Sequence, residues 1–196
     1  KVKKIIFLTN PRLVNLFKNY FYNRPENNIE IDSLENKIND FDAHLPAGSI
    51  MRIIKYNPQL DSKKSFSFLK SKKEDDAFFS KHMGNKVLNV GLSWKSSNTK
   101  EIYRNINFDK IINLLNKNIK TSFYNLQFDL SYKEIEEAKK NNLIFFDNLD
   151  YKKDIDKVAS IIENLDIVIT VQNTIAHLSC ALKKKTYLLL PLGSRW

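Results

Sequence analysis

Polar residues that could bind a phosphate directly follow an apolar run near the C-terminus. The run 165–171 is rich in β-branched residues and shows no polar alternation, which is typical of a buried parallel strand. Asn173 and Thr174 come next, and apolar residues return at helical spacing from Ile175, so a helix is predicted to begin near Asn173. A helix start at the carboxyl end of a strand offers free N–H groups to an anion.

The same predicted helix carries His177 and the single cysteine of the chain. His177 lies four residues after Asn173, so both side chains should share one helix face. Cys180 can form no internal disulfide and cannot supply a metal cluster. We interpret it as a small buried apolar residue of this helix.

A second polar stretch, 94–105, contains hydroxyl groups, two lysines and an arginine, as a diphosphate site would require. It follows a predicted strand, and Gln127 ends the next one. Loops after parallel strands share one rim of a sheet, so both should lie near Asn173. A solvated surface loop would have the same composition, and that alternative stays open.

Three further groups of polar residues have two interpretations each. In the loop 41–49, His44 could act as a base in a cleft or could bond to backbone. Asp154 and Asp156 have the spacing of metal-binding carboxylates, but a helix-capping role for Asp154 is favoured, and no metal site is predicted. The adjacent carboxylates at 75–76 are interpreted in the same way, as first-turn charges of a helix.

Strands and helices are predicted to alternate regularly from residue 86 onward, which indicates an α/β fold with a doubly wound parallel sheet. The predicted strands are 87–93, 119–126, 143–146, 165–171 and 186–190, and the predicted helices are 108–115, 131–139, 154–163 and 173–182.

The N-terminal part is predicted to form a smaller unit, residues 1–85, against a C-terminal unit of residues 86–196, with 71–85 as the linker between them. Its predicted elements are a strand at 3–9, a helix from Pro11 that ends before Pro25, a strand at 29–34, a short helix within 50–56 and an extended piece at 66–69. The chain has no initiator methionine, so we expect a fragment whose N-terminal unit is incomplete.

Composition narrows the classes of function. The 196 residues, 42% of them hydrophobic, are enough for one large or two small domains, and four glycines leave no phosphate-binding glycine motif. The net charge of +10 suggests nucleic acid as one partner, but the lysines are spread through the chain. No apolar run could span a bilayer and no signal peptide is recognisable, so a cytoplasmic location is expected. A peripheral contact with the inner membrane is left open.

Several motifs together resemble the glycosyltransferases that are fused to tetratricopeptide repeats, relatives of the bacterial heptosyltransferases. The motifs are Val90-Gly91-Leu92-Ser93-Trp94, Arg104-Asn105-Ile106, Phe123 to Gln127, Asp166 to Val171, Ala176-His177-Leu178, Leu190-Pro191, Arg195-Trp196, and the N-terminal loop Phe41 to Pro46 with Ser49. The order of these motifs is more specific than any one of them.

The resemblance implies a GT-B-like architecture of two Rossmann-like halves, with acceptor on the N-terminal half and nucleotide-sugar donor on the C-terminal half. It implies no further cofactor and no metal. By position, the donor would meet Trp94, Ser96, Ser97, Lys100, Arg104, Gln127, Asn173, Thr174 and His177. His44, and after it Asp42, are the residues expected to act as the base.

Three residue pairs depart from the family pattern. Gln172-Asn173 stands where the family has Asp-Thr, which removes a charge. Lys157-Val158 replaces a second Asp-Thr, and Lys183-Lys184 replaces Gly-Lys.

The leading hypothesis is a metal-independent, inverting glycosyltransferase that transfers a sugar to a glycan, lipid-linked or protein acceptor. The alternatives are a non-catalytic relative that binds a nucleotide or glycan as an interaction module, and a nucleic-acid binder motivated by the positive charge. No specific nucleic-acid partner is expected under the leading hypothesis.

Overall fold

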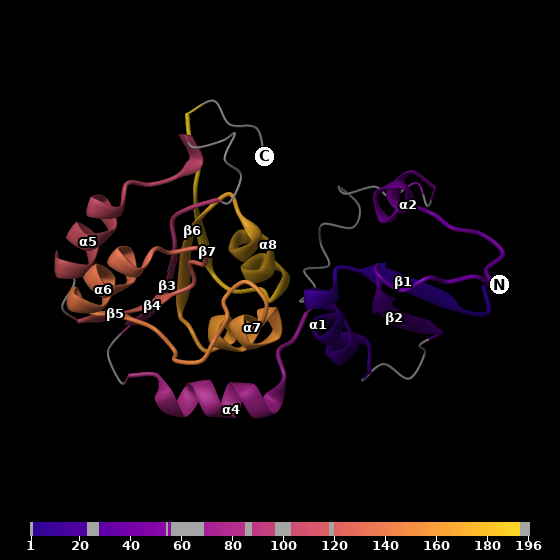
Figure 1. The fold of residues 1–196 in the computed structure, drawn as a ribbon, viewed down its shortest axis with the longest axis horizontal. Coiled ribbons are helices and arrows are strands. Elements are labelled where there is room, and N and C mark those ends of the chain that lie inside the picture. The colour runs from indigo at the N-terminus through magenta and orange to yellow at the C-terminus, as the bar shows by residue number, and fades with distance from the viewer. Residues whose placement is uncertain are drawn as a thin grey trace.

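The computed structural model describes residues 2–22, 28–53, 55, 69–84, 88–96, 103–117 and 120–192. Its main body is a five-stranded parallel sheet with helices on both faces (Figure 1). The strands are β3 (Leu88–Ser93), β4 (Thr121–Asn125), β5 (Leu143–Ile144), β6 (Ile167–Val171) and β7 (Thr186–Leu189).

The strand order is β5-β4-β3-β6-β7, with every neighbouring pair parallel. The chain therefore moves outward from β3 to β5 and then returns to β6 on the other side of β3. The predicted α/β class and the parallel sheet are confirmed, and the predicted strands and helices of this part all occur with small shifts of their ends. The helices are α5 (Phe108–Lys117), α6 (Tyr132–Lys140), α7 (Ile155–Glu163) and α8 (Thr174–Ala181).

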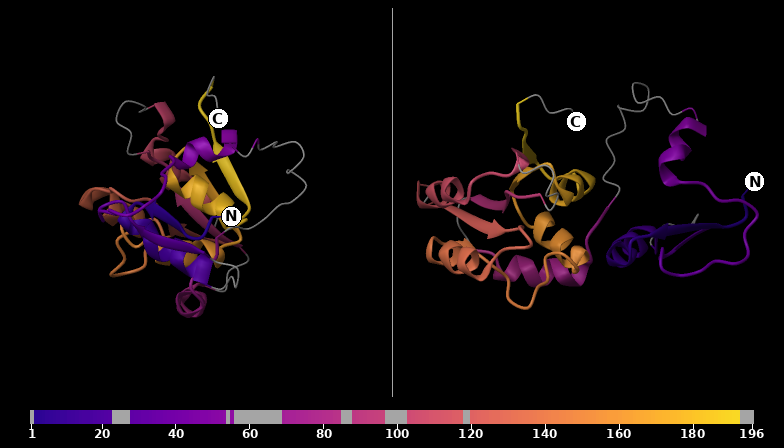
Figure 2. Two further views of the ribbon diagram at one scale, coloured as in Figure 1. Left: turned by 90° about the vertical axis from the view of Figure 1, so that its right-hand side faces the viewer. Right: turned by 45° about the horizontal axis from the view of Figure 1, so that its top comes forward.

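Alternating side chains of the strands feed two apolar clusters, one on each face. Val90, Leu92 and Phe123 pack with α5 and α6 on one face. Tyr124 and Val168 pack with α7 and α8 on the other. Figure 2 shows the two helical layers from other directions. Covering both faces explains why the strands lack polar alternation.

Gly91 in the central strand allows a close approach inside the second of these clusters. A Cβ atom at this position would lie 2.5 Å from the side chains of both Leu126 and Leu165. A larger residue would have to displace two buried leucines, so the glycine is set by packing.

The N-terminal part consists of a parallel pair, β1 (Ile5–Thr9) and β2 (Ile29–Ser33), joined by α1 (Pro11–Tyr22), and a short helix α2 (Ala47–Ile53). These match the predicted strands and the first helix, while α2 begins earlier than predicted. Of the extended piece predicted at 66–69, only Leu69 lies within the described residues, and its N–H donates to Ala181 O.

The segment predicted as a linker contains a packed helix. Helix α4 (Lys73–His82) lies against α7, and its Phe79 is 4% exposed within the cluster on that face. Glu74, Asp75 and Asp76 occupy its first turn, as predicted. The charged first turn gave no sign of this packing, although Asp75 and Asp76 are themselves half-buried.

Candidate functional site

Two loops meet at the point where the strand order reverses, between β3 and β6. Ligands of open α/β sheets bind outside the carboxyl ends of the strands at such a point. The Asn173 amide joins the loops, since its Nδ2 donates to Ser93 Oγ at 2.7 Å and to Lys95 O at 3.0 Å. The sequence prediction that Asn173 and the loop after β3 share one rim is confirmed.

Asn173 is also the N-cap of α8. Its Oδ1 accepts from Ile175 N at 3.0 Å, from Ala176 N at 3.4 Å and from Thr170 Oγ1 at 3.0 Å. The side chain thus satisfies two of the N–H groups that a helix start leaves open. An anion at this helix start would meet fewer free donors than the sequence suggested.

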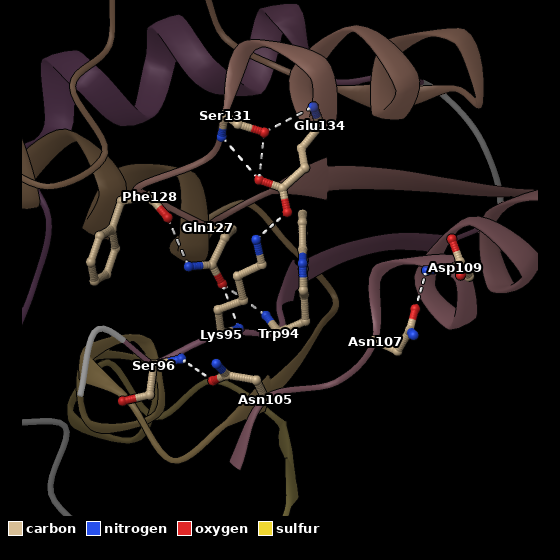
Figure 3. Close-up of polar contacts among 10 residues, drawn as sticks. All are labelled: Trp94, Lys95, Ser96, Asn105, Asn107, Asp109, Gln127, Phe128, Ser131 and Glu134. Carbon is tan, nitrogen blue, oxygen red and sulfur yellow. Dashed lines mark hydrogen bonds and ion pairs between the residues drawn. The ribbon is translucent and has the colours of Figure 1, made fainter. Parts of the chain in front are cut away.

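Gln127 joins the ends of β3 and β4 through a buried amide (Figure 3). Its Oε1 accepts from Ser93 Oγ at 3.0 Å, Trp94 N at 2.9 Å and Lys95 N at 2.8 Å. Its Nε2 donates to Phe128 O at 2.8 Å. Gln127 therefore fixes the shape of the rim, because these bonds engage both ends of its amide.

The loop after β3 differs in part from its predicted role. The Trp94 indole is 1% exposed and stacks on Phe108 at 5.8 Å, so this side chain packs in the core and not at the rim. Ser96 N donates to Asn105 Oδ1 at 2.8 Å. Arg104 is half-buried, with its guanidinium 6.0 Å from the centre of the Tyr103 ring. Ser97 and Lys100 lie outside the described residues.

An ion pair between Lys95 and Glu134 was not anticipated from the sequence as part of the rim. The two side chains are 28% and 22% exposed. Ser131 N and Oγ both donate to Glu134 Oε2 at 2.9 Å in a capping box at the start of α6. Burial raises the pKa of Glu134, but the hydrogen bonds from Lys95 and Ser131 outweigh it, so the pKa lies below its usual value. The Ser-x-x-Glu spacing was the available sequence signal for the helix start.

A hollow of about 410 Å³ opens beside this rim, at the carboxyl ends of β4 and β5. Its walls come from the loops that follow the two strands and from α6. It is lined by Asn125, Gln127, Phe128, Asp129, Leu130, Ile135, Lys139, Phe145, Phe146, Asp147, Asn148, Leu149, Asp150, Tyr151 and Lys152. Its volume falls in the range of small-molecule sites. Another hollow, of about 430 Å³, follows the outer edge of β5, away from the switch point.

Charges in the hollow beside the rim are mixed. Lys152 Nζ lies 3.4 Å from Asp129 Oδ2 and 5.9 Å from the centre of the Phe128 ring. The N–H groups of Lys152 and Lys153 donate to Asp150 and hold its pKa below the usual value. Carboxylates and an aromatic ring suit hydroxyl groups and a planar base better than a phosphate.

The remaining predicted donor residues lie on α8. Thr174 is half-buried, whereas His177 is exposed on the helix surface. The preceding Gln172 is 5% exposed, and its Oε1 has no hydrogen-bond partner among the described residues. Cys180 is exposed, contrary to prediction, because the core-facing residues Ile175 and Leu178 place it on the opposite side of the helix.

The predicted base is not brought to this site. Asp42 and His44 are both exposed, and His44 packs edge-on against Phe41 at 5.7 Å. Their segment, between β2 and α2, lies on the side of the N-terminal part that faces away from the C-terminal sheet (Figures 1 and 2). Asp154, expected to cap α7, accepts from Asp150 N at 3.0 Å and makes no cap bond to the helix.

Among the described residues, no group of three or more His, Cys, Asp or Glu side chains lies where it could hold a metal ion. None of the helices in the described ranges has both the length and the apolar character that crossing a membrane requires. Comparison with protein-family models, curated proteins and solved structures gives no match.

Proposed function

We propose that the chain is a glycosyltransferase-like domain whose C-terminal sheet binds a nucleotide-diphosphate sugar. The observation that carries the proposal is the hollow at the carboxyl ends of β4 and β5, on the same rim as the β3–β6 switch point and connected to it through Gln127. The nucleobase and ribose of the donor would occupy the hollow, and its diphosphate would extend toward the loop after β3.

The distribution of charge supports this orientation. The hollow contains Asp129, Asp147 and Asp150, which would accept hydrogen bonds from hydroxyl groups. The rim carries Lys95 and Arg104, whose cationic side chains suit a diphosphate. The order of motifs in the sequence gives independent support, because it resembles that of the repeat-linked glycosyltransferases.

In this proposal transfer is inverting and independent of metal. A general base would remove the proton from the acceptor hydroxyl while the nucleoside diphosphate leaves. His44, or else Asp42, is the residue expected for this role from the sequence, and its segment would have to approach the hollow for transfer to occur. The acceptor, a glycan, lipid-linked or protein hydroxyl, would approach from the N-terminal part.

A second candidate function is non-catalytic binding of the same nucleotide. It is favoured by one observation: the segment that carries Asp42 and His44 lies away from the sheet (Figure 1). A binding module would take up the nucleoside diphosphate without hydrolysing or transferring the donor sugar.

Calorimetric titration with ADP, GDP, CDP and UDP, each beside its nucleoside, tests the proposal. We expect at least one diphosphate to bind. Phe128→Ala should weaken binding of that diphosphate and of its nucleoside alike, by about 1 to 3 kcal/mol, the range for stacking of a base on an aromatic ring. Arg104→Ala should weaken binding of the diphosphate by about 1.5 to 3 kcal/mol and leave binding of the nucleoside unchanged.

Phe78→Ala is the matched control, since this phenylalanine is 53% exposed on α4 and outside the hollow. Failure of all four diphosphates to bind would overturn the proposal. Binding without hydrolysis of the corresponding nucleotide sugars, even with acceptor candidates present, would favour the non-catalytic function.

A further inference from the structure

The backbone of Lys95 is fixed at the switch point from two sides. Its N–H donates to Gln127 Oε1 at 2.8 Å, and its carbonyl accepts from Asn173 Nδ2 at 3.0 Å. Both partners are at least nine-tenths buried. The Lys95 side chain thus starts from a well-defined position, although it follows a strand end.

The ammonium group of Lys95 is paired with a carboxylate that has other partners. Glu134 Oε1 meets Lys95, while Glu134 Oε2 accepts from Ser131 N and Ser131 Oγ at 2.9 Å (Figure 3). Without Lys95, the carboxylate would keep both bonds from Ser131. The pair can therefore open without leaving a half-buried charge unsatisfied.

Neither Lys95 nor Glu134 lines the hollow itself, but each is next to a residue that does. Gln127, which bonds to the Lys95 backbone, lines it, and so does Ile135, the neighbour of Glu134. Lysine has a long, flexible side chain with three donors at its end, so a change of rotamer suffices to redirect the ammonium. A phosphate at the rim would offer it a stronger negative charge than one carboxylate.

We propose that Lys95 is a phosphate-binding residue of this site and that Glu134 acts as its counter-ion until a ligand binds. This inference rests on the proposed function, because it assigns a role within the same nucleotide site. Glu134 is a positioning residue in this scheme: it competes with the phosphate for the ammonium and does not touch the ligand.

The Glu134→Gln variant tests whether Glu134 competes with the phosphate for Lys95 or only forms a structural ion pair with it. Glutamine at this position retains the capping box of α6, so the helix start should persist. Removing the competing charge should tighten binding of the diphosphate by about two- to fivefold, the worth of a partly exposed ion pair. Affinity for the corresponding nucleoside should not change.

Lys95→Met should lower the affinity for the diphosphate by about tenfold or more and leave the affinity for the nucleoside unchanged. Lys95→Arg keeps the charge and should retain most of the affinity. The double variant should behave as Lys95→Met alone, since Glu134 acts only through Lys95. Glu30→Gln, which breaks the Lys4–Glu30 pair between β1 and β2, is the remote control and should change neither affinity.

Calorimetry with the tightest of ADP, GDP, CDP and UDP, alongside a thermal melt of every variant, decides the matter. If Glu134→Gln weakens the diphosphate, or if all variants change nucleoside and diphosphate equally, the pair is structural and the inference is wrong. That result leaves the proposed function standing, provided the wild-type protein binds. A wild-type protein that binds no diphosphate overturns both.

Discussion

At the scale of single residues, the buried amides of Gln127 and Asn173 organise the site. Each is at least nine-tenths buried, and each joins the end of β3 to another strand end. The sequence indicated which loops these residues belong to, because strand ends on one rim follow from the alternation of elements. It could not indicate that both amides bond inward, since the partners of a side chain depend on tertiary distances that the sequence does not contain.

The same limit explains why the buried position of the Trp94 side chain was not foreseen. A large aromatic residue in a polar loop fits a ligand contact as well as a core position, and only the stacking on Phe108 distinguishes the two. Lys95 shows the opposite case. From the sequence it is an ordinary loop lysine, and nothing there indicates that its backbone is fixed and its side chain is paired.

The phenol of Tyr151, which lines the hollow, should ionise at an unusually high pH. Burial is the main cause that raises its pKa from 10.0 to about 12, and its oxygen accepts a bond from Phe146 N at 2.9 Å. Between pH 10 and about 12 the unfolded chain loses this phenolic proton while the folded protein retains it. The free energy of unfolding should therefore fall across this window, by about 1 kcal/mol at pH 11 from this group alone.

Urea unfolding of wild type and Tyr151→Phe at pH 9 and at pH 11 measures this effect, because other titrating groups cancel in the difference. The near-ultraviolet absorbance of the folded wild-type protein, minus that of the variant, should show one phenol that ionises near pH 12. A difference spectrum that is already half complete near pH 10 would contradict the prediction.

At the scale of elements, the spacing of apolar residues predicted the C-terminal sheet and its helices well. Parallel strands covered on both faces and amphipathic crossovers have distinct periods, so their alternation is readable. The start of α4 was predicted but its packing was not, because a run of charges dominates its sequence and a single phenylalanine, Phe79, is buried in the core. Periodicity is weak evidence where one residue carries the packing.

The end of α8 carries strain that a single substitution should relieve. Lys183 has φ 60° and closes a Schellman motif, in which Lys183 N donates to Cys180 O and Lys184 N to Ser179 O, both at 2.9 Å. Lys183→Gly should stabilise the protein by about 1 kcal/mol, since glycine adopts this conformation without steric cost.

Lys183→Ala is the control, because alanine removes the charge and keeps the unfavourable φ. Its free energy of unfolding should remain within about 0.5 kcal/mol of wild type. Urea unfolding of the three proteins gives the comparison, and equal stability of the glycine and alanine variants would show that charge, and not conformation, governs this position.

At the scale of the whole molecule, helices from outside the sheet complete its core. Leu16 of α1 and Phe79 of α4 join the apolar cluster formed by α7, α8 and the strands. Arg12 of α1 also donates to Lys152 O at 3.2 Å. The cluster thus connects both sequence-predicted units, and residues between them contribute to its packing.

Helix α4 is the element that best tests this organisation, because two neighbouring phenylalanines differ in burial. Phe79 is 4% exposed, and the centre of its ring lies 4.8 Å from that of Phe146, whereas Phe78 is 53% exposed. Phe79→Ala should destabilise the protein by about 3 to 5 kcal/mol through the cavity it leaves, and Phe78→Ala by about 1 kcal/mol or less.

Limited trypsin digestion followed by mass spectrometry shows whether α4 is packed in solution. In wild type and Phe78→Ala, the chain should be cut after Lys37, in the exposed stretch 34–46, well before any cut after Lys73 or Lys81 in α4. In Phe79→Ala the helix loses its anchor, so cleavage after Lys81 should become as fast as cleavage after Lys37. Rapid cleavage after Lys81 in the wild-type protein would instead mean that this segment is a linker, as its charged sequence first suggested, and that the sheet forms its core without it.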